Sequence, residues 1–168
     1  QGTPLVMTTK AAAPNKTSLE ISVMGNTMQK AVFNGEKGYQ EAQGQKKEMT
    51  AEEIAKAKEE SSLFIDFTYT SGELIRIEPL EGKNAIVLNY NDTDMYYDMA
   101  SGLKLKEVKT VKTPDGKEVK VPTTFSDYKE VNGIMFPHAI GQKMGPMDLN
   151  FVIKEIKVNE GVSDADFE

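Results

Sequence analysis

The chain contains no cysteine and no tryptophan, and it contains only one histidine, His138. Without cysteine there is no disulfide, no thiol nucleophile and no zinc site built on thiolates. A single histidine cannot make a zinc site of the ordinary kind. We therefore expect His138, which follows Phe136 and Pro137, to be structural or at the surface. The absence of cysteine does not select a cellular compartment.

An excess of positive charge is also missing. The 168 residues carry a formal net charge of -6, with 27% charged residues of both signs. Because nucleic-acid binding requires a basic face, nucleic acid is not an expected partner. No apolar run approaches the roughly 20 residues that span a bilayer, so no transmembrane segment is expected. The chain begins at Gln1 without a visible signal peptide, and we expect it to be excised from a longer protein.

Motifs for catalysis are absent as well. No serine lies in a nucleophile elbow, and the glycines do not form a phosphate-binding loop. Asp92, Asp94 and Asp98 resemble a calcium loop in spacing, but the required glycine and distal glutamate are missing. No pair of carboxylates stands out for glycoside hydrolysis. We expect no catalytic residue, no metal site, no cofactor and no enzyme activity.

The sequence does contain many short strand patterns. In the segment 17–24, Leu19, Ile21 and Val23 alternate with polar residues, and residues 28–33 follow a turn as a hairpin partner. From 63 to 158, further strands are separated by turns rich in Gly, Asn, Asp and Pro. The expected strands there are 63–70, 74–78, 85–90, 95–98, 103–113, 117–122, 125–130, 134–140 and 147–158.

These patterns predict an α+β, mostly β fold. Its main element is a strongly curved antiparallel sheet, an unclosed barrel, with one or two covering helices. Within the long strands, the apolar residues change phase after Leu105 and after Ile153. Such a change is typical of a bulge or bend, although partial burial of both faces explains it equally well.

One segment, 50–60, is predicted to be a helix. Thr50 and Glu53 have the spacing of a capping box. The apolar stripe is thin and consists of Ala51, Ile54 and Ala55, which fits either an ordinary surface helix or a movable lid. The acidic tail from Asn159 is expected to fray, unless Phe167 docks.

Several strand-turn-strand motifs resemble those of periplasmic lipoprotein-carrier-like domains of the outer-membrane lipoprotein-sorting, LolA/LolB type. The motifs are residues 28–39, residues 96–103, the "DYKEVNGIMFP" segment at 127–137, and the end of the last strand at 155–159. The resemblance covers most of the chain and implies one domain over 1–168. It also implies an apolar cavity for acyl chains and a location in the periplasm or cell envelope. Similar domains follow insulinase-type zinc protease domains, but an expected N-terminal helix and the protease motif His-x-x-Glu-His are absent here.

Two functions remain open at this point. The first is a non-catalytic envelope domain that binds an apolar ligand, such as a lipid or lipoprotein acyl chain, in the concavity of the sheet. The second is a non-catalytic interaction or structural domain that docks on another domain of a zinc protease-like parent protein. Nine methionines fit either an adaptable apolar surface or ordinary core filling. The expected ligand-binding residues, which a packed core would explain as well, are Leu19, Ile21, Val23, Met28, Phe33, Ile65, Phe67, Leu88, Phe136 and Phe151.

Overall fold

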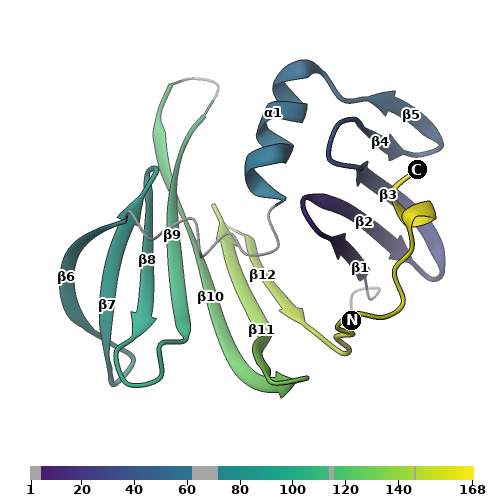
Figure 1. Cartoon of the computed structure of the whole chain (residues 1–168). Helices are drawn as coiled ribbons and strands as arrows, with labels where there is room; N and C mark the ends of the chain where they lie inside the picture. Colours follow the sequence, from purple (N-terminus) through teal and green to yellow (C-terminus); the bar gives the residue numbers. More distant parts are fainter. Residues whose placement is uncertain (1–4, 62–71, 114–115, 146) are drawn as a thin grey trace. The chain divides into compact units, whose positions relative to one another are not determined.

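The computed structural model describes residues 5–61, 72–113, 116–145 and 147–168. The chain forms two compact units (Figure 1). The first unit combines residues 1–68 with 159–168, and the second unit contains residues 69–158. The expectation that 1–168 form one domain stays a prediction.

The first unit contains a five-stranded antiparallel sheet in which each strand pairs with the next along the chain. Tight two-residue turns with positive φ at both positions connect several strands, for example Met24 with Gly25 and Gln43 with Gly44. The sequence patterns at 17–24 and 28–33 predicted β2 and β3, whereas β5 gave no such signal because it is entirely polar. The strands are β1 (Leu5–Ala12), β2 (Lys16–Val23), β3 (Asn26–Phe33), β4 (Gly38–Ala42) and β5 (Gln45–Glu48).

The helix α1 (Ala51–Glu60) follows β5 in the first unit. Its capping box is confirmed, because the Thr50 side chain accepts from the Glu53 N–H and the Glu53 side chain accepts from the Thr50 N–H. The predicted apolar stripe was wrong at two positions. Ala51 and Ala55 are exposed, whereas Ile54 and Ala57 are half-buried. The helix therefore presents a face with a three-residue spacing to the sheet.

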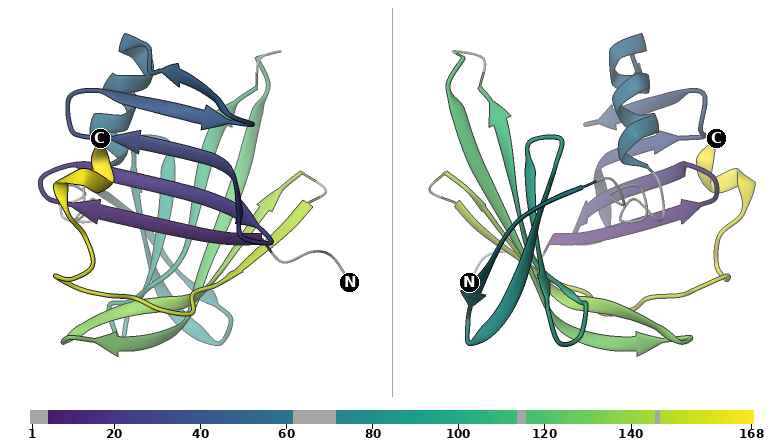
Figure 2. Two further views of the ribbon diagram at one scale, coloured as in Figure 1. Left: turned by 90° about the vertical axis from the view of Figure 1, so that its right-hand side faces the viewer. Right: turned by 60° about the vertical axis from the view of Figure 1, so that its left-hand side comes forward.

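The C-terminal segment covers the other face of the same sheet, which we call the outer face (Figure 2, left). It contains the short 3-10 helix η2 (Asp164–Phe167). Phe167 is only 3% exposed and packs with Val32, Tyr39 and Ala12. Of the two expectations for the tail, the docking of Phe167 is confirmed for these residues, because its ring is buried and holds the segment on the sheet.

The second unit is a seven-stranded antiparallel sheet that is strongly curved (Figure 2, right). Ala85 and Val87 on the buried strand β7 pack with Tyr96 in its core. The order across the sheet is β12-β11-β10-β9-β8-β7-β6. The strands are β6 (Glu73–Leu80), β7 (Lys83–Tyr90), β8 (Thr93–Asp98), β9 (Lys104–Lys112), β10 (Glu118–Val131), β11 (Ile134–Met144) and β12 (Met147–Val152).

The two phase changes in the sequence have different outcomes. The pairing of β8 with β9 shifts between Tyr96 and Tyr97, which leaves Leu105 as the extra residue and confirms a bulge there. The second change instead marks the end of β12 at Val152, so the predicted strand 147–158 was too long. The predicted strands 117–122 and 125–130 are one continuous strand, β10.

The predicted fold class is confirmed. The chain is α+β and mostly β, its antiparallel sheets are open, and among the described residues α1 is the one α-helix. The predicted strand at 63–70 lies outside the described residues. The described strands of the region 63–158 form one sheet, as the sequence pattern suggested, and β1 to β5 form a second sheet.

Candidate functional site

An apolar pocket lies between the last turn of α1 and the middle of the five-stranded sheet. Its volume is about 230 Å³. Among the described side chains that line it, none is charged, and the hydroxyl groups belong to Thr17 and Ser61. The lining residues are Thr17, Leu19, Ala31, Val32, Phe33, Met49, Ala57 and Ser61.

The strand pairing brings the floor of this pocket together. Thr17 pairs with Phe33 and Leu19 pairs with Ala31, so these four residues share the sheet face that α1 covers. Phe33 is only 1% exposed, and Leu19 is half-buried. The floor is therefore formed by side chains of two neighbouring strands.

A glycine allows the segment before α1 to approach the sheet. The Met49 N–H donates to the Gly38 carbonyl at 2.9 Å. A Cβ atom at Gly38 would lie 2.5 Å from the Met49 sulfur and 2.5 Å from the Val32 carbonyl oxygen. Only glycine fits here, because any side chain would displace either the Met49 wall of the pocket or the β3 backbone.

The last turn of α1 supplies the remaining wall. Ala57 and Ser61 both line the pocket, and the Ser61 N–H donates to the Ala57 carbonyl at 2.9 Å. Ser61 is 7% exposed, and its hydroxyl is buried without a hydrogen-bond partner in the described part of the chain. The Ser61 hydroxyl is thus a buried polar group beside the pocket that no described residue satisfies.

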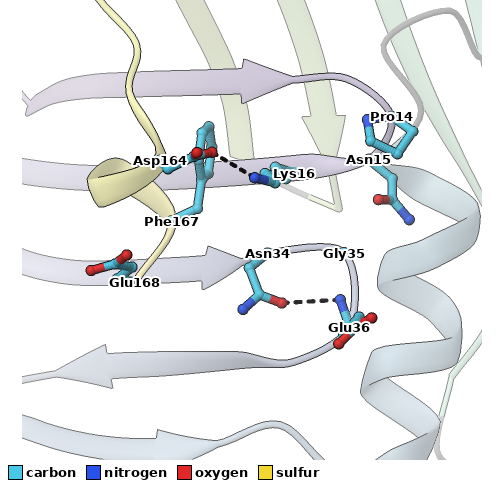
Figure 3. A pocket seen from close by; sticks show the side chains of 9 residues that line it. All are labelled: Pro14, Asn15, Lys16, Asn34, Gly35, Glu36, Asp164, Phe167 and Glu168. Atoms are coloured by element: carbon cyan, nitrogen blue, oxygen red, sulfur yellow. Dashed lines mark hydrogen bonds and ion pairs between the residues drawn. The ribbon is translucent and has the colours of Figure 1, made fainter.

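A second hollow of about 560 Å³ lies at one end of the outer face, beside η2 (Figure 3). Its lining includes Lys16, Glu36, Asp164 and Glu168, so acidic groups outnumber basic ones. Lys16 is already paired with Asp164 at 2.6 Å, and the Asn34 side chain accepts from the Glu36 N–H at 3.0 Å. Because Lys16 is already paired and the other charged groups in the described lining are acidic, this hollow is a weaker candidate for binding an apolar ligand.

Ion pairs hold the C-terminal segment on the outer face. Lys10 Nζ lies 2.5 Å from an Asp166 carboxylate oxygen, and the Ser163 N–H donates to the other oxygen at 2.7 Å. The Lys10 hydrogen bond, followed by the Ser163 backbone, lowers the pKa of Asp166 to about 2. A hydrogen bond from Lys16 also lowers the pKa of Asp164. Both carboxylates are therefore stabilised in their charged form where the segment docks.

The residues predicted from sequence to bind a ligand are divided between the two units. In the first unit, Leu19 and Phe33 line the apolar pocket. Ile21 and Val23 follow Leu19 on the same face of β2 and are half-buried. Met28 is the extra residue of a bulge in β3 and is 47% exposed. Ligand contact by these residues stays a prediction.

Three further predicted residues belong to the second unit. The pairing registers place Leu88, Phe136 and Phe151 on one face of the seven-stranded sheet, where all three are half-buried. Their proposed role in binding also stays a prediction. The remaining two, Ile65 and Phe67, lie outside the described residues.

The residues considered for other chemistry have structural partners. His138 is 8% exposed, and its Nδ1 lies 3.1 Å from the Phe136 carbonyl oxygen. Asp98 accepts from the Ser101 hydroxyl at 2.6 Å and from the Ala100 N–H at 3.2 Å, and these bonds lower its pKa. The described ranges contain no group of three or more His, Asp or Glu residues that would hold a metal ion.

Sequence reasoning missed Thr17, Ala31, Met49, Ala57 and Ser61 as pocket residues. The spacing of Ile54, Ala57 and Ser61 is three and then four residues, which is the spacing of one helical face. This was an available signal for the side of α1 that faces the sheet. Met49 had no such signal, because its position depends on the close approach at Gly38.

Comparison with known proteins identifies the fold. A LolA superfamily protein from Nitrosomonas europaea matches this structure with a TM-score of 0.56 over 98% of this chain and 87% of the other. The chain has a LolA-like fold. At 11% identity, this likeness concerns the fold alone. No protein-family description matches the sequence. No curated protein matches it either.

The LolA-like fold confirms the resemblance seen in the strand-turn-strand motifs of the sequence. Within the described residues, none of the helical structure has the length and apolar character needed to cross a membrane.

Proposed function

We propose that this chain is a non-catalytic domain of the periplasm or cell envelope that binds an apolar ligand, such as a lipid or a lipoprotein acyl chain. The observation that carries the proposal is the uncharged pocket between α1 and strands β2 and β3. Burial of an alkyl chain there contributes roughly 0.8 kcal/mol per CH₂ group. The LolA-like fold supports the same function by analogy.

The size of the pocket indicates that α1 must move to admit a long chain. Its volume of about 230 Å³ is below the roughly 300–1,000 Å³ of ordinary small-molecule pockets. Ile54 and Ala57 are the half-buried apolar residues of the helix, so little apolar contact is lost when the helix shifts. The capping box at Thr50 and Glu53 is local to the helix, and it can keep the first turn intact during such a movement.

The first test is native mass spectrometry of the purified protein, with lipid extraction from the same sample. We expect a co-purifying acyl lipid. The variant Ala57→Phe fills the pocket and should abolish the bound species. The matched control is Ala55→Phe, because Ala55 is exposed on the same helix. A wild-type protein that stays free of ligand even after incubation with lipid would overturn the proposal.

The second candidate function is docking on another domain of a longer parent protein, such as a zinc protease-like protein. It is favoured by exposed apolar side chains on β6, an end strand among those described in the seven-stranded sheet. Leu74, Ile75 and Ile77 are 58%, 47% and 56% exposed. Unpaired strand edges with apolar side chains readily add another chain.

This alternative is tested by light scattering and by binding to the neighbouring domain of the parent protein. Binding that is lost in Ile77→Lys and retained in Lys83→Ala would support it. A protein that is monomeric and binds no neighbouring domain would remove its basis.

A further inference from the structure

The C-terminal segment, residues 159–168, is bound to the outer face by two carboxylates that lie close together in the sequence. The Asp166 carboxylate accepts from Lys10 Nζ at 2.5 Å, and the Asp164 carboxylate accepts from Lys16 Nζ at 2.6 Å. Lys10 belongs to β1 and Lys16 to the neighbouring strand β2. The sheet therefore offers two cations to carboxylates that are spaced two residues apart.

An aromatic ring follows directly after these carboxylates. The Phe167 ring is 3% exposed and packs against Val32, Tyr39 and Ala12. The Tyr39 hydroxyl also donates to the Glu168 carbonyl at 3.2 Å. In the described structure, the hydrogen bonds and ion pairs that join the segment to the sheet thus all come from residues 164–168.

Recognition of so short a stretch does not require that it be attached to the second unit. Residues 153–163, which lead from β12 to η2, contain no helix or strand. Peptide-binding surfaces commonly read a few side chains and backbone groups of a short segment, whichever chain presents it. A peptide with the same side chains on another protein would be able to make the same contacts.

The segment leaves part of the outer face unused. The hollow of about 560 Å³ lies directly beside Phe167 and Glu168, which line it (Figure 3). On the other side, Lys46 Nζ lies 3.6 Å from the centre of the Tyr39 ring and Lys30 Nζ lies 6.0 Å from it. Neither lysine is paired with the segment in the described part of the chain. A longer peptide would therefore find further contacts on this face.

The charges of the outer face favour an acidic partner. The pairing registers place four lysines and three glutamates on this face, although the whole chain has a net charge of -6. The positive excess attracts an acidic peptide and steers its approach. These residues are Lys10, Lys16, Lys30, Lys46, Glu20, Glu41 and Glu48.

We propose that the outer face is a docking surface for a partner protein's peptide segment that carries a phenylalanine with aspartates one and three residues before it. The chain's own C-terminal segment is then a tethered occupant that this partner displaces. The surface is separate from the apolar pocket on the other face of the sheet. The tether gives the chain's own segment an effective concentration on the order of millimolar. The partner overcomes this advantage through contacts in the hollow and beside Lys30 and Lys46.

The experiment adds the acetylated peptide of residues 161–168 to the full chain carrying Phe167→Ala, which weakens the chain's own segment. Binding is followed by NMR through the amide signals of Val32 and Tyr39. A second peptide carries the Phe167→Ala change itself. Two further proteins add Lys10→Met or Lys47→Met to Phe167→Ala. Lys47 is a matched control because it lies on β5 and points to the opposite face from Lys46.

We expect saturable binding of the peptide, and binding at least about ten-fold weaker for the peptide without the ring. Lys10→Met should weaken binding about three- to ten-fold, and Lys47→Met should leave it unchanged. In the wild type, a millimolar excess of the peptide should move the Phe167 ring signals towards their solvent-exposed positions. This measurement decides the matter if Phe167→Ala does not fold.

Three results would overturn the proposal. In the first, the peptide does not bind folded Phe167→Ala and leaves the wild-type ring signals in place. In the second, the peptide without the ring binds equally well, which would reduce the effect to general charge attraction. In the third, sedimentation shows a wild-type dimer that Phe167→Ala abolishes, which would assign the surface to a second copy of this chain.

Discussion

The two faces of the five-stranded sheet are covered by short segments that are packed against it to very different extents. On the outer face, Phe167 is 3% exposed and ion pairs reach Asp164 and Asp166. On the other face, α1 contributes the half-buried Ile54 and Ala57 and leaves a pocket of about 230 Å³. The C-terminal segment therefore packs closely on the sheet, whereas α1 leaves an apolar pocket beneath it.

The largest expected effect concerns Phe167, whose ring is buried where the C-terminal segment docks on the outer face. Phe167→Ala should lower the free energy of unfolding by about 3 to 5 kcal/mol, because it empties a buried site. Ile54→Ala should cost only about 1 kcal/mol, since this helix side chain is half-buried. Amide hydrogen exchange in β3 measures both changes in the same sheet.

The control for this comparison is Val162→Ala, because Val162 is 41% exposed beside the same segment. It should change the free energy of unfolding by less than about 0.5 kcal/mol. Equal costs for Phe167→Ala and Ile54→Ala would show that the two covers are held equally firmly.

Acid should release the C-terminal segment from the outer face. The pKa of Asp166 is about 2 in the docked segment, below its ordinary value of 3.8. Such a lowered pKa favours docking above pH 3.8, and this contribution is lost as the pH falls towards 2. The Phe167 ring resonances in an NMR titration report the release.

Lys10→Met tests the assigned cause, because Lys10 makes the largest contribution to this lowered pKa. The substitution should raise the pKa of Asp166 and move the release to higher pH. Ring resonances that stay in the docked position down to pH 2 in both proteins would contradict the prediction.

On the face of the sheet that α1 covers, one substitution should increase the free energy of unfolding. Ser61→Ala removes an unpaired buried hydroxyl, so the ligand-free protein should become more stable by about 1 to 2 kcal/mol. Urea unfolding of protein that has been stripped of lipid measures the change. Ser18→Ala should give no such gain, because the Ser18 hydroxyl is not a buried group lacking a partner. A loss of stability in Ser61→Ala would mean that the hydroxyl already has a structural role.

The smallest expected effect is on the start of α1. Thr50→Ala removes one half of the capping box and should destabilise the helix by about 1 kcal/mol. Faster hydrogen exchange of the first-turn amides, with β3 unchanged, is the expected result. Faster exchange throughout the sheet would show that α1 is coupled to the sheet more strongly than its half-buried residues indicate.

Local sequence patterns predicted much of the fold, because the relevant physics is local. The alternation of Leu19, Ile21 and Val23 defines β2, and Thr50 with Glu53 defines the start of α1. The division into two sheets falls between β5 and β6, and the hairpin patterns on either side do not record whether these two strands pair with each other. Strand β5 was missed because all its side chains are polar.

The continuity of β10 was hidden by a proline. Pro122 pairs with Val108 of β9, while the pairing with β11 begins only at Thr123. At Pro122 the strand therefore has a described neighbour on one side only, so the missing N–H is tolerated. The sequence showed the proline but could not show which neighbours it would face.

The pocket was predictable only in part. Leu19 and Phe33 were expected on the inner face of a curved sheet from their alternation, and they lie in the floor of the pocket. Ala57 and Ser61 depend on which side of α1 meets the sheet, and Met49 depends on the space above Gly38. These are properties of packing between elements, which alternation and helical spacing constrain only weakly.

The docking of the C-terminal segment also has a consequence for biosynthesis. The five-stranded sheet is made from residues 5–48, but the outer face is covered by residues that follow the entire second unit. During translation at about 5–20 residues per second, Val32 and Tyr39 stay uncovered for on the order of ten seconds. The first unit thus begins to emerge before the second unit and is completed after it. In this interval its uncovered face is a natural place for a chaperone to bind.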